Sequence, residues 1–310
     1  MREIMKTMQF TEEEIAYFLD LDAHLTDAAR ARIDFLFERY LRLKIDDNFA
    51  EGEWRTNVKV GEVLGYLGEG MGVHPYTMHM LFLIRCAKWL PGEYERRGLD
   101  AANAVNMIQD IRCKLRECEK MEGFMGTSVY NWFHRHFLVT RFALGRFQYD
   151  PGIWEYENDY VFGDYRITKG DKIVRFHIPS SGPMTREMRL DSYRRCWEFF
   201  KPESGIMNIV CGSWLLYGGN RHVYPEGSNL MDFMDDFDLI ESHEDKNSVF
   251  SNAWRVFYKN YDGGDTSYLP QETTLQKNYV KWLAAGNKVG GGTGIILFDG
   301  EKIINNKRDN

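Results

Sequence analysis

Apolar side chains in the first 120 residues recur every three to four positions, which is the spacing of a helix with one buried face. Thr11 and Glu14 have the spacing of a capping box, in which a hydroxyl and a carboxylate satisfy backbone amides where a helix starts. A helix is therefore predicted to begin after Thr11, and a long helix is predicted from Asp27 onward.

Two further helices are predicted from the same periodicity. One covers Tyr76–Trp89 and is expected to end at Pro91-Gly92, because proline and glycine interrupt helices. The other begins after Asp100, whose carboxylate can cap it. Antiparallel packing of four or five helices is the simplest arrangement for this half of the chain.

Beyond about residue 140 the pattern changes to short β-rich runs separated by Gly, Pro and Asp. Two helices are expected among these runs, one after Thr185 and one after Thr273 or Thr274. The predicted strands are Phe142–Tyr149, Tyr160–Thr168, Lys172–Ile178, Ile206–Cys211, Ala253–Tyr258 and Gly294–Phe298. The chain is therefore expected to be an α+β protein, with an all-helical domain at residues 1–139 and an α/β domain at 140–310.

Composition narrows the class of protein. The chain has 310 residues, 44% of them hydrophobic, and a net charge of −7, which argues against a nucleic-acid or membrane partner. The amino terminus lacks the apolar stretch of a signal peptide, so a cytoplasmic protein is expected. Five cysteines without a C-x-x-C pair are expected to be reduced and mainly buried.

Histidines and acidic residues suggest sites only weakly. His134-Arg135-His136 has too few supporting ligands for a metal site, so a metal-dependent hydrolase has little support and a polar strand or interdomain contact is preferred. The acidic stretch 232–245 could attract a cationic substrate, but interleaved apolar residues favour a short amphipathic helix with a solvated acidic face.

Two glycine-rich stretches resemble phosphate loops superficially. Gly65–Gly72 lies within the helical half and runs into Pro75, which favours an interhelical loop. Gly290–Gly294 precedes a predicted strand, so close backbone approach or a bulge is expected there instead.

The most informative segment runs from residue 172 to residue 216 and reads strand, tight loop, helix, strand. Thr185 is a good helix N-cap, so the loop before it ends at helix amides that could receive an anion, with Arg186 and Arg189 nearby. Any β-α-β connection also needs such a loop. Both interpretations stay open on the residues alone.

Five sequence blocks resemble those of a known family. They are LGRFQYD at 144–150, FHIPSSGPMT at 176–185, CGSWLL at 211–216, YPEGSNLMDF at 224–233 and LPQETTLQKNYVKWLAAGNKVGGGTG at 269–294. In this order they resemble bacterial acyltransferase-domain proteins, which have a helical N-terminal domain and a C-terminal domain similar to the GNAT N-acyltransferases.

The resemblance implies a GNAT-like domain with a mixed central sheet and an acyl-CoA or acetyl-CoA donor. In that fold two neighbouring strands splay apart, the pantetheine pairs with one of them, and the pyrophosphate rests on the next helix amino terminus. Lys172–Ile178 would be the central strand and Ile206–Cys211 its splayed partner. The expected donor-binding residues are then Ile178, Ser180, Ser181, Gly182, Thr185 and Arg186.

The implied activity is N-acyl transfer to a small amine-containing acceptor, with no metal. His177 lies opposite the face formed by Val174, Phe176 and Ile178, and its ordinary pKa suits a general base. A packed or surface histidine is the alternative interpretation. Tyr217 and Tyr224 follow the second strand, where GNAT enzymes often keep a tyrosine acid.

One departure from the family pattern supports an alternative. GNAT enzymes usually carry Arg/Gln-x-x-Gly-x-Gly/Ala as a phosphate loop, whereas this chain has IPSSGPMT, with one glycine and a proline that has no amide donor. A noncatalytic GNAT-like module that binds a small metabolite or a partner protein is therefore the second hypothesis. The acyl chain length, the acceptor and the oligomeric state are left open.

Overall fold

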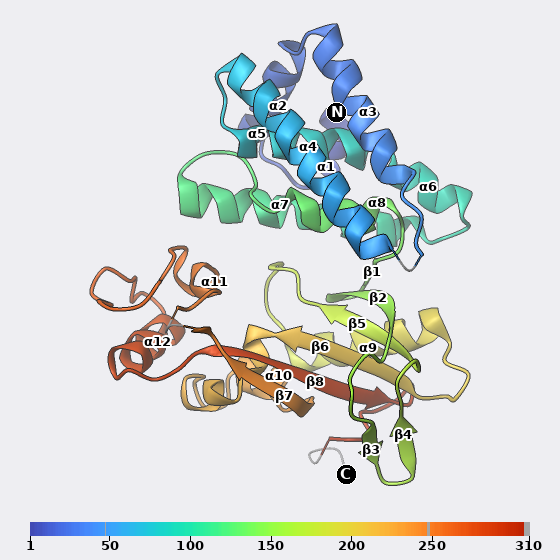
Figure 1. Cartoon of the computed structure of the whole chain (residues 1–310), viewed down its shortest axis with the longest axis vertical. Helices are drawn as coiled ribbons and strands as arrows, with labels where there is room; N and C mark the ends of the chain where they lie inside the picture. Colours follow the sequence, from blue (N-terminus) through green and yellow to red (C-terminus); the bar gives the residue numbers. More distant parts are fainter. Residues whose placement is uncertain (47, 247–248, 307–310) are drawn as a thin grey trace. The chain divides into compact units, whose positions relative to one another are not determined.

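The computed structural model describes residues 1–46, 48–246 and 249–306 (Figure 1). The chain forms two compact units, Met1–Ala143 and Leu144–Asn310, which we call the helical unit and the sheet unit. Periodicity predicted an all-helical first part and strands with interspersed helices in the second, and the family resemblance implied that the sheet is mixed. The structure confirms this α+β organisation.

The helical unit consists of helices joined by short connections. Its helices are α1 (Arg2–Thr7), α2 (Glu12–Ala23), α3 (Asp27–Leu41), α4 (Phe49–Met71), α5 (Pro75–Ala87), α6 (Leu90–Arg96), α7 (Ala101–Glu122), the 3-10 turn η1 (Tyr130–Phe133) and α8 (His134–Phe137). The predicted capping box is present, because the Thr11 hydroxyl accepts from the Glu14 amide and the Glu14 carboxylate accepts from the Thr11 amide.

Three predictions for this unit were wrong. Pro91-Gly92 does not end a helix; Pro91 sits in the first turn of α6, where its missing amide is not needed. Gly65, Gly68 and Gly70 lie inside α4, which ends at Gly72 in the left-handed conformation. His134-Arg135-His136 begins the short helix α8, so the polar strand was wrong, whereas the interdomain contact given as its alternative stays a prediction.

The sheet unit is built around a six-stranded mixed sheet in the order β1-β2-β5-β6-β8-β7. Its strands are β1 (Phe142–Leu144), β2 (Phe147–Ile153), β5 (Lys172–His177), β6 (Met207–Ser213), β7 (Asp238–Glu244) and β8 (Gly290–Phe298). β5 and β6 are parallel, whereas β2 with β5, β6 with β8 and β7 with β8 are antiparallel. A separate hairpin joins β3 (Tyr160–Phe162) to β4 (Tyr165–Ile167).

Each face of the sheet has its own apolar core. On one face, Phe176 contacts Tyr193 of α9 (Arg186–Phe200) and Phe233 of α10 (Asn229–Met234). On the other face, side chains around the β3–β4 hairpin cover the sheet, with Trp154, Tyr160, Ile167, Ile173, Val210, Ile295 and Leu297 buried together. Because strand side chains alternate between faces, His177 lies on the face opposite Phe176.

The rest of the sheet unit corrects two predictions. Residues 253–258 were expected to be a strand, but Ala253–Phe257 is helix α11, and the predicted helix after Thr273 is α12 (Thr274–Ala284). The acidic stretch is not one solvated helix, because it divides into α10 and the edge strand β7. Short 3-10 turns η2 (Trp214–Leu216) and η3 (Gly218–His222) follow β6.

The glycines near residue 290 lie within β8, and close backbone approach explains them. A Cβ on Gly292 would collide with the Leu216 carbonyl group, and a Cβ on Gly294 would lie 2.8 Å from Cβ of Phe237. All five cysteines lie in the described residues as thiols outside any disulfide, and four of them, Cys86, Cys118, Cys196 and Cys211, are buried. Among the described helices, none combines the length and apolar character needed to cross a bilayer.

Candidate functional site

The parallel strands β5 and β6 pair over only part of their length. Their paired residues are Val174 with Ile209 and Arg175 with Val210, although β5 continues to His177 and β6 continues to Ser213. All residues of both strands are described, so the pairing stops at this point. Because the strands are parallel, the chain leaves both of them at the same end of the sheet, and that end is where the candidate residues gather.

The loop after β5 leads directly to the amino end of α9. Ser180, Ser181 and Gly182 are exposed, and Gly182 has φ +118°, a conformation that favours glycine. Thr185 caps α9, because its hydroxyl accepts from the Met188 amide at 3.4 Å. Ile178 lies just beyond the last residue of β5 and is half-buried.

Two guanidinium groups hold the inner side of this loop. Arg146 donates through Nε to the Pro183 carbonyl and through Nη2 to the Gly182 carbonyl, both at 2.8 Å. Arg189 donates through Nη1 to the Met184 carbonyl, also at 2.8 Å. The peptides are trans, so the amides of Met184 and Thr185 point away from these guanidinium groups. Three consecutive carbonyls are thereby turned inward.

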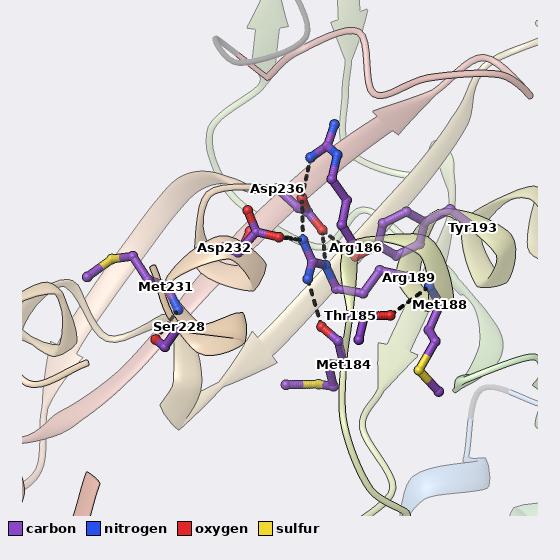
Figure 2. Close-up of polar contacts among 10 residues, drawn as sticks. All are labelled: Met184, Thr185, Arg186, Met188, Arg189, Tyr193, Ser228, Met231, Asp232 and Asp236. Atoms are coloured by element: carbon purple, nitrogen blue, oxygen red, sulfur yellow. Dashed lines mark hydrogen bonds and ion pairs between the residues drawn. The ribbon is translucent and has the colours of Figure 1, made fainter. Parts of the chain in front are cut away.

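Arg189 is buried and joins α9 to α10 (Figure 2). Its Nε donates to Asp236 Oδ2 at 2.6 Å and its Nη2 donates to Asp232 Oδ2 at 2.5 Å. Tyr193 also donates to Asp236 Oδ2, at 3.1 Å. Burial raises the pKa of Asp236, while the Arg189 guanidinium acts in the opposite direction. Arg189 therefore has a structural role, and the idea that it faces an anion was wrong.

Arg186 is more exposed than Arg189. It is partly exposed at the start of α9, and its Nη1 lies 3.7 Å from Asp236 Oδ1 (Figure 2). Asp236 makes its shorter contacts with Arg189 and Tyr193. The contact of Arg186 with Asp236 is therefore longer than the contact that Arg189 makes with the same carboxylate.

His177 pairs with a buried carboxylate. Its Nε2 is in hydrogen-bond contact with Oδ1 of Asp150 on the neighbouring strand β2. The Asp150 side chain is only 3% exposed, whereas the His177 side chain is 22% exposed. The imidazole thus has one nitrogen fixed by the protein interior and keeps part of its surface accessible.

The two tyrosines are both buried and differ in their hydrogen-bond contacts. Tyr224 is buried, and its hydroxyl donates to the Leu215 carbonyl at 3.0 Å and accepts from Asn220 Nδ2 at 2.9 Å. Burial raises its pKa strongly. Tyr217 lies at the end of η2, and burial is also the main cause of its raised pKa, followed by Glu244 and Asp245. Tyr224 therefore supports the turn after β6, and Tyr217 is the tyrosine that stays a candidate acid.

Sequence reasoning missed two residues of this region. Arg146 and Asp150 both lie in the block LGRFQYD, which was recognised only as a resemblance. The one available signal for Asp150 was its position directly after the predicted strand Phe142–Tyr149, because a charge that becomes buried beside a strand needs a partner. No signal pointed to Arg146, since its acceptors are backbone carbonyls 36 and 37 residues away.

The histidines of the helical unit do not form a metal centre. His79 donates from Nδ1 to the Thr127 carbonyl at 3.1 Å, and His134 donates from Nε2 to the Tyr40 carbonyl at 3.2 Å. Burial lowers the pKa of each to about 4. Within residues 1–46, 48–246 and 249–306, no three His, Cys, Asp or Glu side chains are grouped so that they could hold a metal ion.

Solved structures resemble the whole chain. One is an acyltransferase in complex with decanoyl-CoA and teicoplanin, with 18% identity, a TM-score of 0.59 and coverage of 95% of this chain and 98% of that chain. Another is an acyltransferase in complex with CoA and 10C-teicoplanin, with 17% identity, a TM-score of 0.60 and coverage of 94% and 98%. At these identities the likeness concerns the fold. No curated protein matches the sequence.

Family models match both units of the chain. The model of the N-acyltransferase N-terminal domain matches residues 1–139. The model of the GNAT-like C-terminal domain matches residues 141–296, which is half of the chain. The mixed sheet and the parting of β5 from β6 agree with the second match. The chain therefore belongs to the family that joins an N-acyltransferase N-terminal domain to a GNAT-like C-terminal domain.

Proposed function

We propose that the protein transfers an acyl group from acyl-CoA or acetyl-CoA to a small amine-containing acceptor. The observation that carries this proposal is the end of pairing between β5 and β6, with the loop to α9 and His177 at the same end of the sheet. Where two neighbouring strands stop pairing with each other, the strand edge between them can hydrogen-bond the amide groups of a pantetheine arm, and a helix amino terminus attracts the pyrophosphate. The end of β5 and the amino terminus of α9 are separated in the chain only by the loop at residues 178–185.

The donor site would consist of Ile178, Ser180, Ser181, Gly182, Thr185 and Arg186. Arg146 and Arg189 hold the carbonyls of the loop, so the amides of Met184 and Thr185 are on the other side. Oriented amides next to a helix amino terminus favour an anion, and hydroxyls of Ser180 and Ser181 can add donors. This arrangement would replace the glycine-rich loop of other GNAT enzymes.

The reaction requires three groups. The acceptor nitrogen attacks the thioester carbonyl, a C–N bond forms, the C–S bond breaks, and the amine proton must be removed while the CoA thiolate takes one up. His177 is the proposed base, because its imidazole is partly exposed beside the end of β5. Tyr217 is the proposed acid, and backbone amides after His177 would polarise the carbonyl.

The related structures support this assignment of ligands. The neighbours bind decanoyl-CoA or CoA, and two of them also bind teicoplanin or 10C-teicoplanin. By analogy the present chain would take an acyl-CoA donor and a small-molecule acceptor, without a nucleic-acid or membrane partner. A cytoplasmic location fits such a donor.

Titration calorimetry with CoA, acetyl-CoA and decanoyl-CoA tests the donor site. We expect binding to the intact protein and a weakening in Arg186→Glu of about ten- to a hundredfold, the equivalent of one lost charge-assisted hydrogen bond of roughly 1.5–3 kcal/mol. Arg195→Glu on the same helix is the control, because Arg195 pairs with Asp191 on the surface. Absence of heat with all three compounds would reject the CoA donor.

A noncatalytic GNAT-like module is the second candidate function. The specific observation that favours it is Pro183, which removes one amide from the loop. Such a module would bind a small metabolite or a partner protein at the same place. Tight CoA binding with no release of free thiol across a panel of amines would favour this module over the enzyme.

A further inference from the structure

The contact between His177 and Asp150 crosses two paired strands. In the antiparallel register of β2 and β5, Gln148 faces His177 and Asp150 faces Arg175. Asp150 is therefore diagonal to His177 across the two strands and directly opposite Arg175. An arginine directly opposite a buried aspartate is its natural ion-pair partner, yet the Asp150 contact is made with the histidine.

Gly152 explains why Arg175 takes another direction. A Cβ built on Gly152 would lie 2.8 Å from Nε of Arg175, so the guanidinium occupies the space over this glycine. Its Nη2 lies 3.8 Å from Oε2 of Glu155. Because Gly152 has no side chain, Arg175 can extend along β2 over this residue. Asp150 contacts the imidazole of His177.

This contact determines which imidazole nitrogen carries hydrogen. An ionised carboxylate can only accept, so Nε2 of His177 must donate to Asp150. In the neutral ring Nδ1 then carries no hydrogen and is the nitrogen that can take up a proton. We propose that Asp150 is a positioning residue that holds His177 in this tautomer, so that Nδ1 is the base of the acyl transfer. The inference rests on the proposed function and adds to it the atom that takes the proton.

In the step itself, the acceptor nitrogen forms a bond to the thioester carbon while its proton passes to Nδ1 of His177. The ring becomes an imidazolium, and the Asp150 carboxylate stabilises it through Nε2–H without taking the proton. The C–S bond then breaks, and the CoA thiolate is protonated by the acid. No oxidant, reductant or metal takes part in this balance.

On this face of the sheet, β2 contributes Asp150, β5 contributes Arg175 with its partner Glu155, and β6 contributes the uncharged Val210 and Gly212. Strand β7, which β6 and β8 separate from β5, adds the carboxylates Asp238 and Glu241. Removing the Asp150 charge should therefore lower the pKa of the base in the enzyme. The rising limb of kcat/KM against pH should move to lower pH in Asp150→Asn.

A double-mutant cycle separates positioning from structural support. We expect Asp150→Asn to lower kcat by about 10- to 1,000-fold with donor affinity retained, and Asp150→Glu to restore part of the activity. If Asp150 acts through His177, adding Asp150→Asn to His177→Ala causes no further loss. A second full loss in the double variant, or a pH profile that does not move, would overturn the proposal.

Asp110→Asn is the matched control. Asp110 is a buried carboxylate 3.7 Å from Nε2 of His136 in the helical unit, so it reproduces the loss of a buried carboxylate beside an imidazole. We expect it to leave the pH profile of kcat/KM unchanged. A profile that shifts as much as in Asp150→Asn would show that the effect is not specific to His177.

The ring tautomer can also be measured without any turnover. Nitrogen-15 NMR of the imidazole rings, with His177 assigned through His177→Ala, should show hydrogen on Nε2 in the intact protein and loss of this preference in Asp150→Asn. If acyl transfer is absent but the tautomer is as expected, the proposed function fails and the Asp150 contact stands. If transfer occurs while Nδ1 carries the hydrogen, the positioning role fails and the proposed function stands.

Discussion

His79 and His134 are buried residues whose protonation is linked to folding. Burial lowers the pKa of each from 6.5 to about 4 in the folded protein, whereas the unfolded chain keeps the ordinary value. Between these values the unfolded state binds more protons, so the stabilisation is complete above pH 6.5 and is lost as pH falls toward 4. Each histidine should account for about 3 kcal/mol of this loss.

Urea unfolding followed by circular dichroism from pH 4 to pH 7.5 measures this linkage. His79→Asn keeps a donor for the Thr127 carbonyl but cannot titrate, so its stability should depend less on pH than that of the wild type. His24→Asn, at an exposed position, is the control and should leave the pH dependence unchanged. Equal slopes for His79→Asn and the wild type would contradict the assignment.

Arg189 offers a second test at single-residue scale. Its side chain is fully buried, and it partners both Asp232 and Asp236. Arg189→Met leaves a buried carboxylate uncompensated, so the free energy of unfolding should fall by about 3–5 kcal/mol. Arg195→Met removes an exposed pair on the same helix and should change it by less than about 1 kcal/mol. Thermal unfolding that ranks the two variants equally would refute the structural role of Arg189.

A site residue can be predicted from the sequence when its role depends on local properties, and not when it depends on partners far away in the chain. His177 could be found because strand alternation and its ordinary pKa are both local properties. Asp150 and Arg146 could not be assigned, because their partners come from register across strands and from a distant loop. Tyr224 was a poor candidate because the turn that buries its hydroxyl is not visible in a tyrosine-rich sequence.

Among elements, the two long helices of the sheet unit that are capped by threonine make a matched pair. Thr185 caps α9 and Thr273 caps α12, each through its hydroxyl and the backbone amide three residues later. Replacement of either by alanine should reduce stability by about 1 kcal/mol. Only Thr185→Ala should weaken CoA binding, because α9 alone follows the proposed donor loop. Equal CoA affinity in both variants would remove Thr185 from that site.

The elements that local patterns predicted best are those with caps. Thr11, Asp100, Thr185 and Thr273 all precede helices, since a capping side chain acts within three residues. Helix α11 and strand β7 were missed. β7 carries Glu241, Ser242, His243 and Glu244 and is a strand only because it pairs with the glycine-rich β8, a contact more than 40 residues away.

At the scale of the whole molecule, the division into two units predicts where a donor should protect the chain. All proposed donor residues lie in the sheet unit. Hydrogen exchange with and without CoA should therefore show added protection in β5 and the first turns of α9, because a ligand stabilises the conformation that it binds. Amides of α5 and α7 in the helical unit serve as internal controls. Protection confined to those two helices would contradict the proposed site.

The burial of four thiols has a consequence for an enzyme that handles thioesters. Burial raises the pKa of Cys86, Cys118, Cys196 and Cys211, to about 12 for Cys118. Only a thiolate attacks a thioester or a disulfide at a useful rate. These four side chains are thereby kept from self-acylation by the donor and from mixed disulfides with oxidised CoA, so the folded chain can work beside its own product without being chemically marked by it at these positions.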